Sequence, residues 1–161
     1  MSQIIIGHGL EILETNHIKE YIERSGEDWE MEHFTATERR TPELGSSRIQ
    51  YLAGRFAVKQ AVLKILGISV RPDISWLDME VQRLPTGQPA LVLYGKCQKI
   101  AAEFGINKWL LSISHTSSYV AASVLALRGN VTLLVFWWAM PTLRYIKDFG
   151  VLKGLFQCYC S

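Results

Sequence analysis

The spacing of apolar residues predicts one long helix in the middle of the chain, over residues 47–66. Apolar side chains recur there every three or four positions, which places them on one face of a helix. Gly67 follows this segment and predicts its end. The cationic residues of the segment fall on the other faces: Arg48, Arg55, Lys59 and Lys64.

Short apolar and β-branched runs predict strands on both sides of this helix. The first run, at residues 3–6, stops at Gly7-His8-Gly9, a sequence typical of a tight turn. Later runs flank polar or turn-forming connections and predict two antiparallel units. These units are residues 74–81 with 89–93, and residues 109–113 with 119–127.

A first short helix is predicted between the first strand and the long helix. Three isoleucines between residues 12 and 22 lie at roughly helical spacing. Thr15 or Asn16 is the predicted N-cap, and Gly26 the predicted end. Residues 27–34 add a helical turn.

Two further helices complete the predicted architecture. Thr35 begins a capping box, because Glu38 stands three residues later. Residues 95–104 predict a helix that Gly105 ends. The order of strand, helices, two strands, helix and two strands is typical of an α+β fold with a mostly antiparallel sheet.

The composition is that of one folded domain. The chain has 161 residues, 48% apolar and 20% charged, which excludes a disordered or fibrous protein. Lysines and arginines number 17 against 15 acidic residues, and this near balance argues against a nucleic-acid binder. Three cysteines give no disulfide framework, and the N-terminus does not resemble a signal peptide. The sequence therefore predicts a cytoplasmic protein.

The composition changes at about Gly129. Residues 131–140 are ten consecutive positions without a charge, and the uncharged stretch continues to Leu143. This stretch is shorter than the ~20 apolar residues that a membrane-spanning helix needs. We divide the chain into a domain at residues 1–128 and an apolar extension at 129–161. The extension is a buried packing segment, an interfacial anchor or an appendage outside the domain, and the pattern favours the appendage over membrane contact.

Single motifs near the N-terminus leave several interpretations open. Gly7-His8-Gly9 follows a strand as a dinucleotide fingerprint does, but Ile12 stands in the place of the third glycine. A turn that presents Glu11 is the better interpretation. Glu11 taken alone is a solvated carboxylate more often than a metal ligand.

Two later motifs are equally ambiguous when each is taken alone. Ser114-His115-Thr116 has neither a nucleophile elbow nor a triad arrangement, which favours a polar hairpin loop. On the long helix, Gln60 and Lys64 share one face, and Arg55 and Lys59 share another. The cationic side chains of this helix could hold phosphates, but the helix taken alone favours the solvated side of an amphipathic helix for them.

Four segments taken together resemble the holo-acyl-carrier-protein synthase family of 4′-phosphopantetheinyl transferases, in their order and spacing. The segments are IIIGHGLEILE, RFAVKQAVLK, PTGQPAL and LSISHTSSYVAAS. The similarity extends from about Ile4 to Leu127, roughly the length of that family's single domain. The resemblance implies the 4′-phosphopantetheinyl transferase fold, in which a mostly antiparallel sheet packs against one long helix and shorter helices.

The resemblance also implies an activity. Such an enzyme transfers the phosphopantetheine arm of coenzyme A to a serine of an apo acyl-carrier protein of fatty-acid or polyketide synthesis, and releases adenosine 3′,5′-bisphosphate. The serine hydroxyl attacks the β-phosphorus of a diphosphate, a reaction that needs a divalent cation, phosphate-binding cations and a base. Mg²⁺ fits this chemistry.

The resemblance implies a set of site residues. Glu11 stands where the family has an aspartate metal ligand, Gln60 where it has a glutamate ligand, and Lys64 with Arg55 near the coenzyme A phosphates. With Lys64, the two metal positions form the implied catalytic set. The residues implied at the nucleotide are Gly87, Pro89, His115 and Thr116.

The implied partners are a carrier protein and further copies of the chain. His17 and Arg24 lie where the family has basic residues facing the acidic carrier protein. Single-domain members of the family are homotrimers with sites shared between neighbouring subunits.

Two departures from the family pattern fall on the metal. Glu11 keeps the charge of aspartate but moves its oxygen by about 1.5 Å, one carbon–carbon bond. Gln60 offers an oxygen without negative charge and cannot act as a base. Glu14 is a candidate to compensate for the lost charge. The departures predict a transferase that needs more Mg²⁺ or turns over more slowly.

Two alternatives remain. One is an inactive homologue that still binds coenzyme A or the carrier protein. The other is a membrane-associated interaction protein that acts through residues 131–140.

Overall fold

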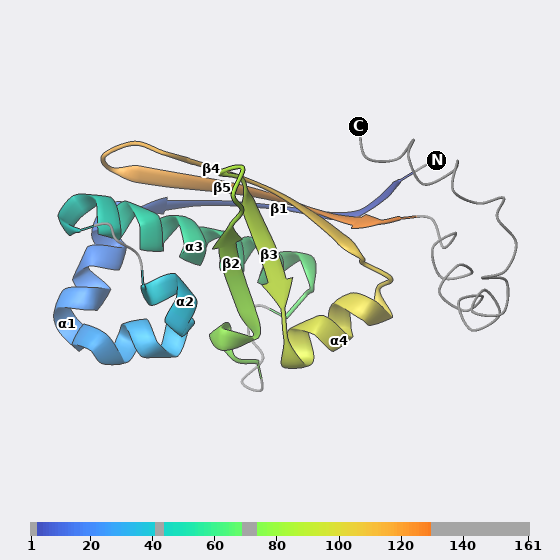
Figure 1. Ribbon diagram of the computed structural model, residues 1–161, viewed down its shortest axis with the longest axis horizontal. Coiled ribbons are helices and arrows are strands. Elements are labelled where there is room, and N and C mark those ends of the chain that lie inside the picture. Colours follow the sequence, from blue (N-terminus) through green and yellow to red (C-terminus); the bar gives the residue numbers. More distant parts are fainter. Residues whose placement is uncertain (1–2, 41–43, 69–73, 130–161) are drawn as a thin grey trace, which may run out of the picture. The chain divides into compact units, whose positions relative to one another are not determined.

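The computed structural model describes residues 3–40, 44–68 and 74–129, and these form one unit over Gln3–Gly129 (Figure 1). The predicted extension lies outside the described residues, except for Gly129. No helix among the described residues is both long and apolar enough to cross a membrane. In chain order the elements are β1 (Ile4–Glu14), α1 (Thr15–His33), α2 (Ala36–Arg39), α3 (Gly45–Ile65), the 3-10 turn η1 (Trp76–Asp78), β2 (Met79–Arg83), β3 (Pro89–Leu93), α4 (Gly95–Glu103), β4 (Lys108–His115) and β5 (Tyr119–Arg128).

Two antiparallel sheets and the helix α3 form the framework. The larger sheet has the strand order β1-β5-β4, and β2 pairs with β3 in a separate hairpin. Helix α3 packs along one face of the larger sheet, mainly on β5 and β1 (Figure 1). Helices α1 and α2 lie at one end of this unit and α4 at the other, with the β2–β3 hairpin between them. The predicted long helix and antiparallel pairing are confirmed.

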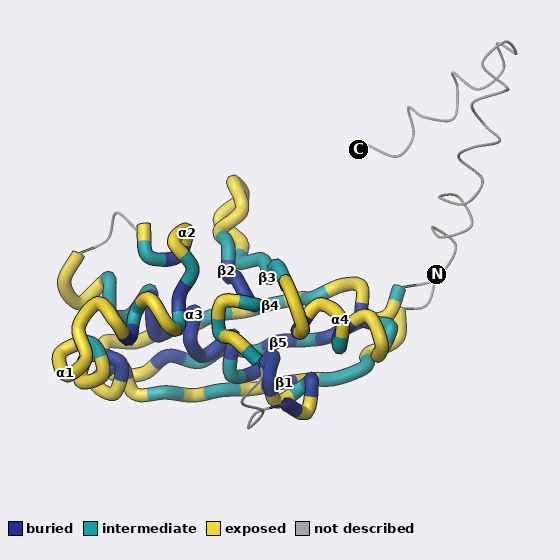
Figure 2. The backbone as a smooth tube through the Cα atoms, turned by 90° about the horizontal axis from the view of Figure 1, so that it is seen from below, coloured by how far each residue is buried: buried dark blue, intermediate teal, exposed yellow. Residues whose placement is uncertain are grey.

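Strand β5 shows which face of the sheet is buried. Its alternate residues Val120, Ala122, Val124 and Ala126 are fully buried beneath α3 (Figure 2). The opposite face carries exposed apolar side chains, among them Ile12 with 62% of its surface accessible. Since side chains alternate along a strand, one face of the sheet is covered and the other is open.

The turn predicted at Gly7-His8-Gly9 is wrong, because β1 continues through it. A Cβ atom at Gly7 would lie 2.8 Å from Cγ2 of Ile65, and one at Gly9 would overlap the backbone oxygen of Ala61. The two glycines therefore allow α3 to approach β1 closely. Ile12 was predicted to lie in the first helix but lies in β1, because the strand continues to Glu14.

Helix α1 begins where predicted but is held differently. Neither Thr15 nor Asn16 caps it; Thr15 Oγ1 instead donates to the backbone oxygen of Ser117 at 3.0 Å, on the loop between β4 and β5. Gly26 interrupts the helix with φ of +58°, a conformation that glycine adopts at little cost, and the helix then resumes to His33. The predicted break and the added helical segment are both present.

The remaining predictions differ mainly at element ends. The capping box is confirmed, with Thr35 Oγ1 accepting from the amide of Glu38. The strand predicted at 74–81 is shifted, because Ser75 Oγ accepts from the amide of Leu77 and begins a 3-10 turn. Strand β4 extends through His115, so Ser114 and His115 belong to a strand and not to a loop.

The solvated face predicted for Arg55 and Lys59 is also wrong. Lys59 is fully buried, and its Nζ donates to Glu38 Oε2 at 2.8 Å and to the backbone oxygen of His33 at 2.7 Å. Burial lowers the pKa of Lys59, and the charge of Glu38 opposes this shift. Because Glu38 Oε1 also accepts from the amide of Val81 at 2.9 Å, this ion pair joins α2, α3 and β2.

Candidate functional site

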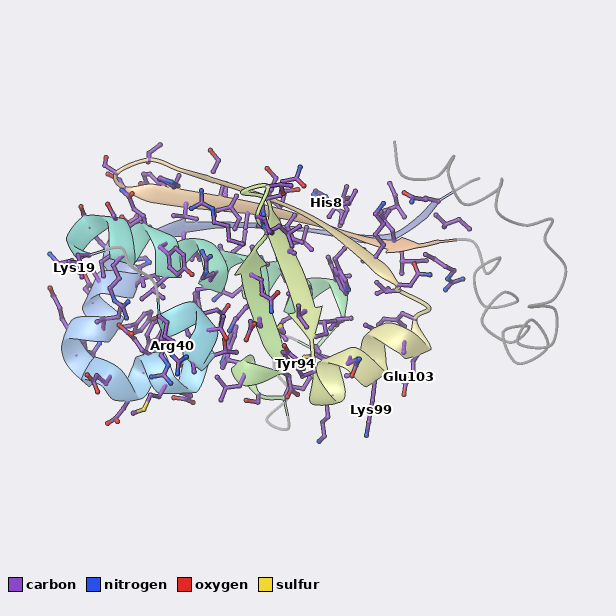
Figure 3. All side chains as sticks on the ribbon, in the orientation of Figure 1. His8, Lys19, Arg40, Tyr94, Lys99 and Glu103 are labelled. Atoms are coloured by element: carbon purple, nitrogen blue, oxygen red, sulfur yellow. The ribbon has the colours of Figure 1, made fainter. Side chains whose placement is uncertain are left out.

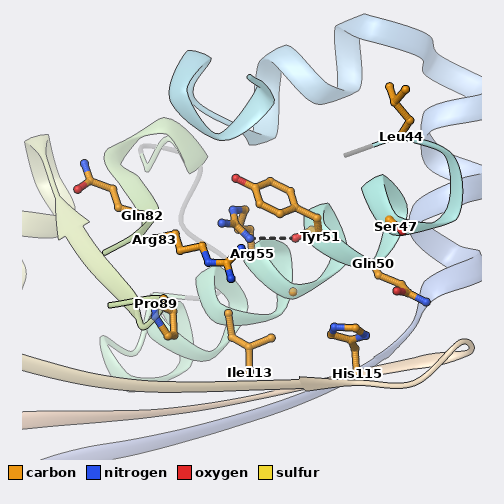
Figure 4. Close-up of a pocket in the computed structure, with 12 residues that line it drawn as sticks. Leu44, Ser47, Gln50, Tyr51, Arg55, Gln82, Arg83, Pro89, Ile113 and His115 are labelled. Atoms are coloured by element: carbon orange, nitrogen blue, oxygen red, sulfur yellow. Dashed lines mark hydrogen bonds between the residues drawn. The ribbon is translucent and has the colours of Figure 1, made fainter. Parts of the chain in front are cut away.

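A pocket of about 660 Å³ lies between α3, the β2–β3 hairpin and β4 (Figure 4). We call it the α3–hairpin pocket. Of the predicted site residues it brings together Arg55, Gly87, Pro89 and His115. Arg83 and polar side chains from α3 complete much of its lining, and none of the described lining residues is a carboxylate. The pocket is therefore a positively charged cavity suited to an anionic ligand.

Arg55 is held in place from several sides. Only 7% of its surface is accessible. Its Cζ lies 3.2 Å from the centre of the Tyr51 ring, and its Nη1 donates to the Tyr51 backbone oxygen at 3.4 Å (Figure 4). A guanidinium fixed in this way keeps its charge and has little conformational entropy left to lose when a phosphate binds.

The hairpin turn gives the pocket its second wall. The amide of Gly87 donates to the oxygen of Leu84 at 2.8 Å, and the amide of Leu84 donates to the oxygen of Gln88 at 2.9 Å. Gly87 has φ of +87°, which side chains other than glycine rarely adopt. The turn thereby places Pro89 opposite Arg83 in the strand register.

His115 and Thr116, predicted at the same ligand, have different positions. His115 ends β4 and lines the pocket, whereas Thr116 is not among the lining residues. Thr116 Oγ1 accepts from the amides of Tyr119 at 3.0 Å and Ser118 at 3.3 Å. In the described structure, Thr116 closes the β4–β5 turn and Gln50 Nε2 donates to its backbone oxygen.

The predicted catalytic residues form a second group on the β1 side of α3, which we call the acid–lysine cluster: the two predicted metal residues Glu11 and Gln60, and Lys64. Glu11 Oε2 lies 2.5 Å from Lys64 Nζ, and the two side chains are 14% and 54% accessible. Lys64 Nζ also reaches the backbone oxygen of Leu10 at 3.5 Å. Gln60 is one turn before Lys64 on the same helical face.

Gln60 lines an aromatic cavity of about 340 Å³ between α1, α3 and β1. Trp29 forms its wall, with its ring centre 4.5 Å from that of His33 and 5.5 Å from that of Phe56. Burial lowers the pKa of His33. His17 from the first turns of α1 lines the same cavity.

Within one chain, the α3–hairpin pocket and the acid–lysine cluster are separate. None of the three cluster residues lines the pocket. Strands β1 and β4 are the two edges of the larger sheet, about 10 Å apart at the usual strand spacing. Along α3, Arg55 and Gln60 are separated by about 7.5 Å of helix rise. A ligand of coenzyme length spans such a gap, but one small anion does not.

Glu14 does not compensate for the missing charge at Gln60. It is exposed on the outer face of the sheet, where its Oε1 accepts from the Tyr119 hydroxyl at 3.3 Å. Glu11 lies on the α3 side of β1, an odd number of positions away, so the two carboxylates point to opposite faces. Among the described residues, no group of three or more His, Cys, Asp or Glu side chains is arranged to hold a metal ion.

Several residues that line the pocket could not be predicted from the sequence. Arg83, Gln82 and Tyr51 have no motif of their own. Arg83 directly precedes the hairpin turn, and this position was the one available signal.

Comparisons with known proteins agree with the predicted family. The sequence model of the 4′-phosphopantetheinyl transferase superfamily matches residues 7–124. A holo-[acyl-carrier-protein] synthase of Koribacter versatilis is 35% identical over 122 residues, covering 76% of this chain and 98% of its own length. That of Caldanaerobacter subterraneus is 39% identical over 122 residues, with coverage of 76% and 94%.

Solved structures show the same similarity. The crystal structure of holo-ACP-synthase from Plasmodium yoelii is 32% identical, with a TM-score of 0.68. The match covers 81% of this chain and 100% of that chain. A Bacillus anthracis holo-(acyl-carrier-protein) synthase, solved in complex with CoA (3′,5′-ADP), is 28% identical with a TM-score of 0.64 and coverage of 78% and 98%.

The chain belongs to the 4′-phosphopantetheinyl transferase superfamily. Within that superfamily, the relatives that it matches over nearly their whole length are holo-acyl-carrier-protein synthases. The predicted resemblance and the predicted fold class are confirmed.

Proposed function

We propose that this chain transfers the phosphopantetheine arm of coenzyme A to a serine of an apo acyl-carrier protein, in the cytoplasm. The α3–hairpin pocket is the observation that carries the proposal. It joins a fixed guanidinium, a histidine and a glycine–proline turn in a cavity whose described lining residues include no carboxylate. This combination suits a nucleotide that carries several phosphates.

In this proposal the pocket holds the nucleotide end of coenzyme A. Arg55 and His115 face its phosphates, and Gly87 and Pro89 contact the nucleoside. The diphosphate then extends along α3 towards Lys64, whose exposed ammonium neutralises its charge. Thr116 acts indirectly, by closing the turn that follows His115.

The acid–lysine cluster is the proposed reaction centre. The serine oxygen forms a bond to the β-phosphorus, the bond from that phosphorus to the bridging oxygen breaks, and adenosine 3′,5′-bisphosphate leaves. Gln60 cannot accept the serine proton, which passes to Glu11 or to water. Glu11 and Lys64 bring the acid and the cation together in one place.

Mg²⁺ is the proposed cofactor. It binds proteins through one or two carboxylates together with substrate phosphates and water, and Glu11 with the Gln60 amide oxygen meets this requirement at its lower limit. When bound, it neutralises charge on the diphosphate and orients its oxygens. Glu11 is paired with Lys64, so the ammonium must leave that carboxylate free before a cation is held there.

The proposed carrier-protein surface is the first part of α1. His17 lines the aromatic cavity that Gln60 also lines, and Arg24 is exposed further along the same helix. A carrier protein bound across α1 therefore reaches the acid–lysine cluster through this cavity. Of these two residues, Arg24 supplies the positive charge that favours an acidic partner.

A homotrimer is the proposed assembly, with sites shared between neighbouring subunits. The open face of the larger sheet supports it, because four large apolar side chains are exposed there: Leu10, Ile12, Leu110 and Tyr119. Exposed apolar surface of this kind is typical of a subunit interface. The separation of the pocket from the cluster within one chain also suits a site completed by a neighbour.

Mass spectrometry of an apo acyl-carrier protein incubated with the full chain, coenzyme A and Mg²⁺ tests the proposal. We expect the carrier to gain the mass of phosphopantetheine, and a carrier with its acceptor serine replaced by alanine to gain none. If no mass is gained while calorimetry detects coenzyme A binding, the chain is the inactive homologue that Gln60 favours as the alternative.

A further inference from the structure

Arg83 is a cation of the α3–hairpin pocket to which the proposed function gives no task. Arg83 is the last residue of β2 and lines the pocket. Its side chain extends towards Arg55 (Figure 4). Within the part of the chain that the structure describes, the side chain of Arg83 makes no hydrogen bond or ion pair. Its charge is therefore available to a ligand.

The hairpin fixes where Arg83 stands. The register pairs it directly with Pro89, and the hydrogen-bonded turn at Gly87 closes four residues later. Gly87 and Pro89 line the same pocket and form the surface proposed to contact the nucleoside. Arg83 thus lies at the nucleoside end of the bound coenzyme.

The diphosphate belongs to the other end. Lys64 and Glu11 lie on the β1 side of α3, outside the pocket. A guanidinium at the nucleoside end consequently needs a different anionic group. Coenzyme A carries one further phosphate, on the 3′-oxygen of its ribose. Among the described residues of the pocket lining, no carboxylate competes for that group with Arg83.

We propose that Arg83 binds the ribose 3′-phosphate and makes this chain select coenzyme A over its 3′-dephospho form. The planar guanidinium presents paired N–H donors that match a phosphate. This inference rests on the proposed function, since it assumes that the pocket holds the nucleotide of coenzyme A. It adds the residue that determines which form of the coenzyme is accepted.

The test is equilibrium binding by calorimetry at low ionic strength, with the full chain and two nucleotides. Adenosine 3′,5′-bisphosphate and adenosine 5′-monophosphate differ only in the 3′-phosphate. For Arg83→Gln we expect about a tenfold or greater loss of affinity for the bisphosphate and less than about a twofold change for the monophosphate. Arg83→Lys is expected to recover part of the lost affinity, because lysine keeps the positive charge but lacks the paired N–H donors of the guanidinium.

Lys99→Gln is the matched control. Lys99 is exposed on α4, points to solvent and is remote from the pocket lining, so its removal changes the net charge by the same amount (Figure 3). We expect Lys99→Gln to bind both nucleotides as the unchanged chain does. A loss there equal to that of Arg83→Gln would assign the effect to net charge and overturn the inference.

Two other results would overturn the inference, and one separates it from the proposed function. Equal losses for both nucleotides would place Arg83 at the 5′-phosphate, and no loss for either would remove it from the site. If the unchanged chain binds the bisphosphate but Arg83→Gln keeps the same selectivity, only Arg83 is excluded. If the unchanged chain binds neither nucleotide, the proposed function fails at its substrate, and Arg83 fails with it.

Discussion

The α3–hairpin pocket and the acid–lysine cluster differ in how their charged groups are held. In the pocket, Arg55 is buried against Tyr51, and the hairpin turn is closed by two backbone hydrogen bonds. In the cluster, Lys64 is half exposed and forms an ion pair with Glu11. The pocket is preorganised for binding, whereas the cluster must rearrange. Affinity for the nucleotide and competence for transfer are therefore separable in this chain.

The largest effect is expected where both regions depend on the same helix. Lys59→Met leaves Glu38 buried without its counter-ion and is expected to destabilise the chain by about 3–5 kcal/mol. Denaturant unfolding measures this loss, with Lys99→Met as the exposed control. A loss within about 0.5 kcal/mol of the control would show that α3 does not depend on this ion pair.

The pocket is tested by Arg55→Gln. Removing a fixed guanidinium is expected to weaken binding of adenosine 3′,5′-bisphosphate by about 10–100-fold, the value of one charge-assisted hydrogen bond. The Mg²⁺ concentration that gives half-maximal transfer is expected to stay the same. A change in that concentration instead would show that Arg55 belongs to the reaction centre.

The cluster is tested by Gln60→Glu. A second carboxylate beside Glu11 is expected to lower the Mg²⁺ requirement of transfer by about tenfold, while nucleotide binding without metal changes little. Transfer assays over a range of Mg²⁺ measure it, with Gln98→Glu on α4 as a charge-matched control, because Gln98 is exposed and lies outside both the cluster and the pocket lining. If activity and Mg²⁺ dependence are both unchanged, position 60 is not a metal ligand.

Lys64→Met tests whether the ammonium competes with a cation for Glu11. Removing it is expected to strengthen binding of Mn²⁺, used as a spectroscopic probe in the absence of coenzyme, by about threefold. Electron paramagnetic resonance of free Mn²⁺ gives the affinity. Weaker or unchanged Mn²⁺ binding would mean that Lys64 does not compete with a metal ion for the Glu11 carboxylate.

The smallest effect is expected from His33 in the aromatic cavity. Burial lowers its pKa below 6.5, so the unfolded chain takes up a proton at a higher pH than the folded chain does. Stability is then complete above pH 6.5 and falls as the pH drops towards the folded pKa, by less than about 1.4 kcal/mol per pH unit. Urea unfolding at several pH values measures the slope, which His33→Gln should reduce.

The parts of the fold that could be predicted are those set by local sequence. The long helix and the capping box at Thr35 follow from periodicity and from a four-residue motif. Gly7 and Gly9 predict a turn, because two glycines close together in the sequence usually mark one. Their true role depends on Ile65 and Ala61, which lie more than fifty residues away in the sequence.

The candidate site divides in the same way. Four of the predicted ligand residues line one pocket. They could be predicted because each belongs to a motif of adjacent positions. Lys59 was misplaced because its partner Glu38 comes from another helix, so no pattern within α3 reveals the burial. Arg83 was missed because its position depends on the pairing of β2 with β3.

The burial of Lys59 gives a chemical test of whether the chain is folded. An amine-reactive reagent needs an accessible, unprotonated amine, and Lys59 offers no surface to it, whereas Lys64, five residues later on α3, is accessible. Covalent labelling of the native chain should therefore modify Lys64 and spare Lys59. Modification of Lys59 would then report opening of the chain around α3.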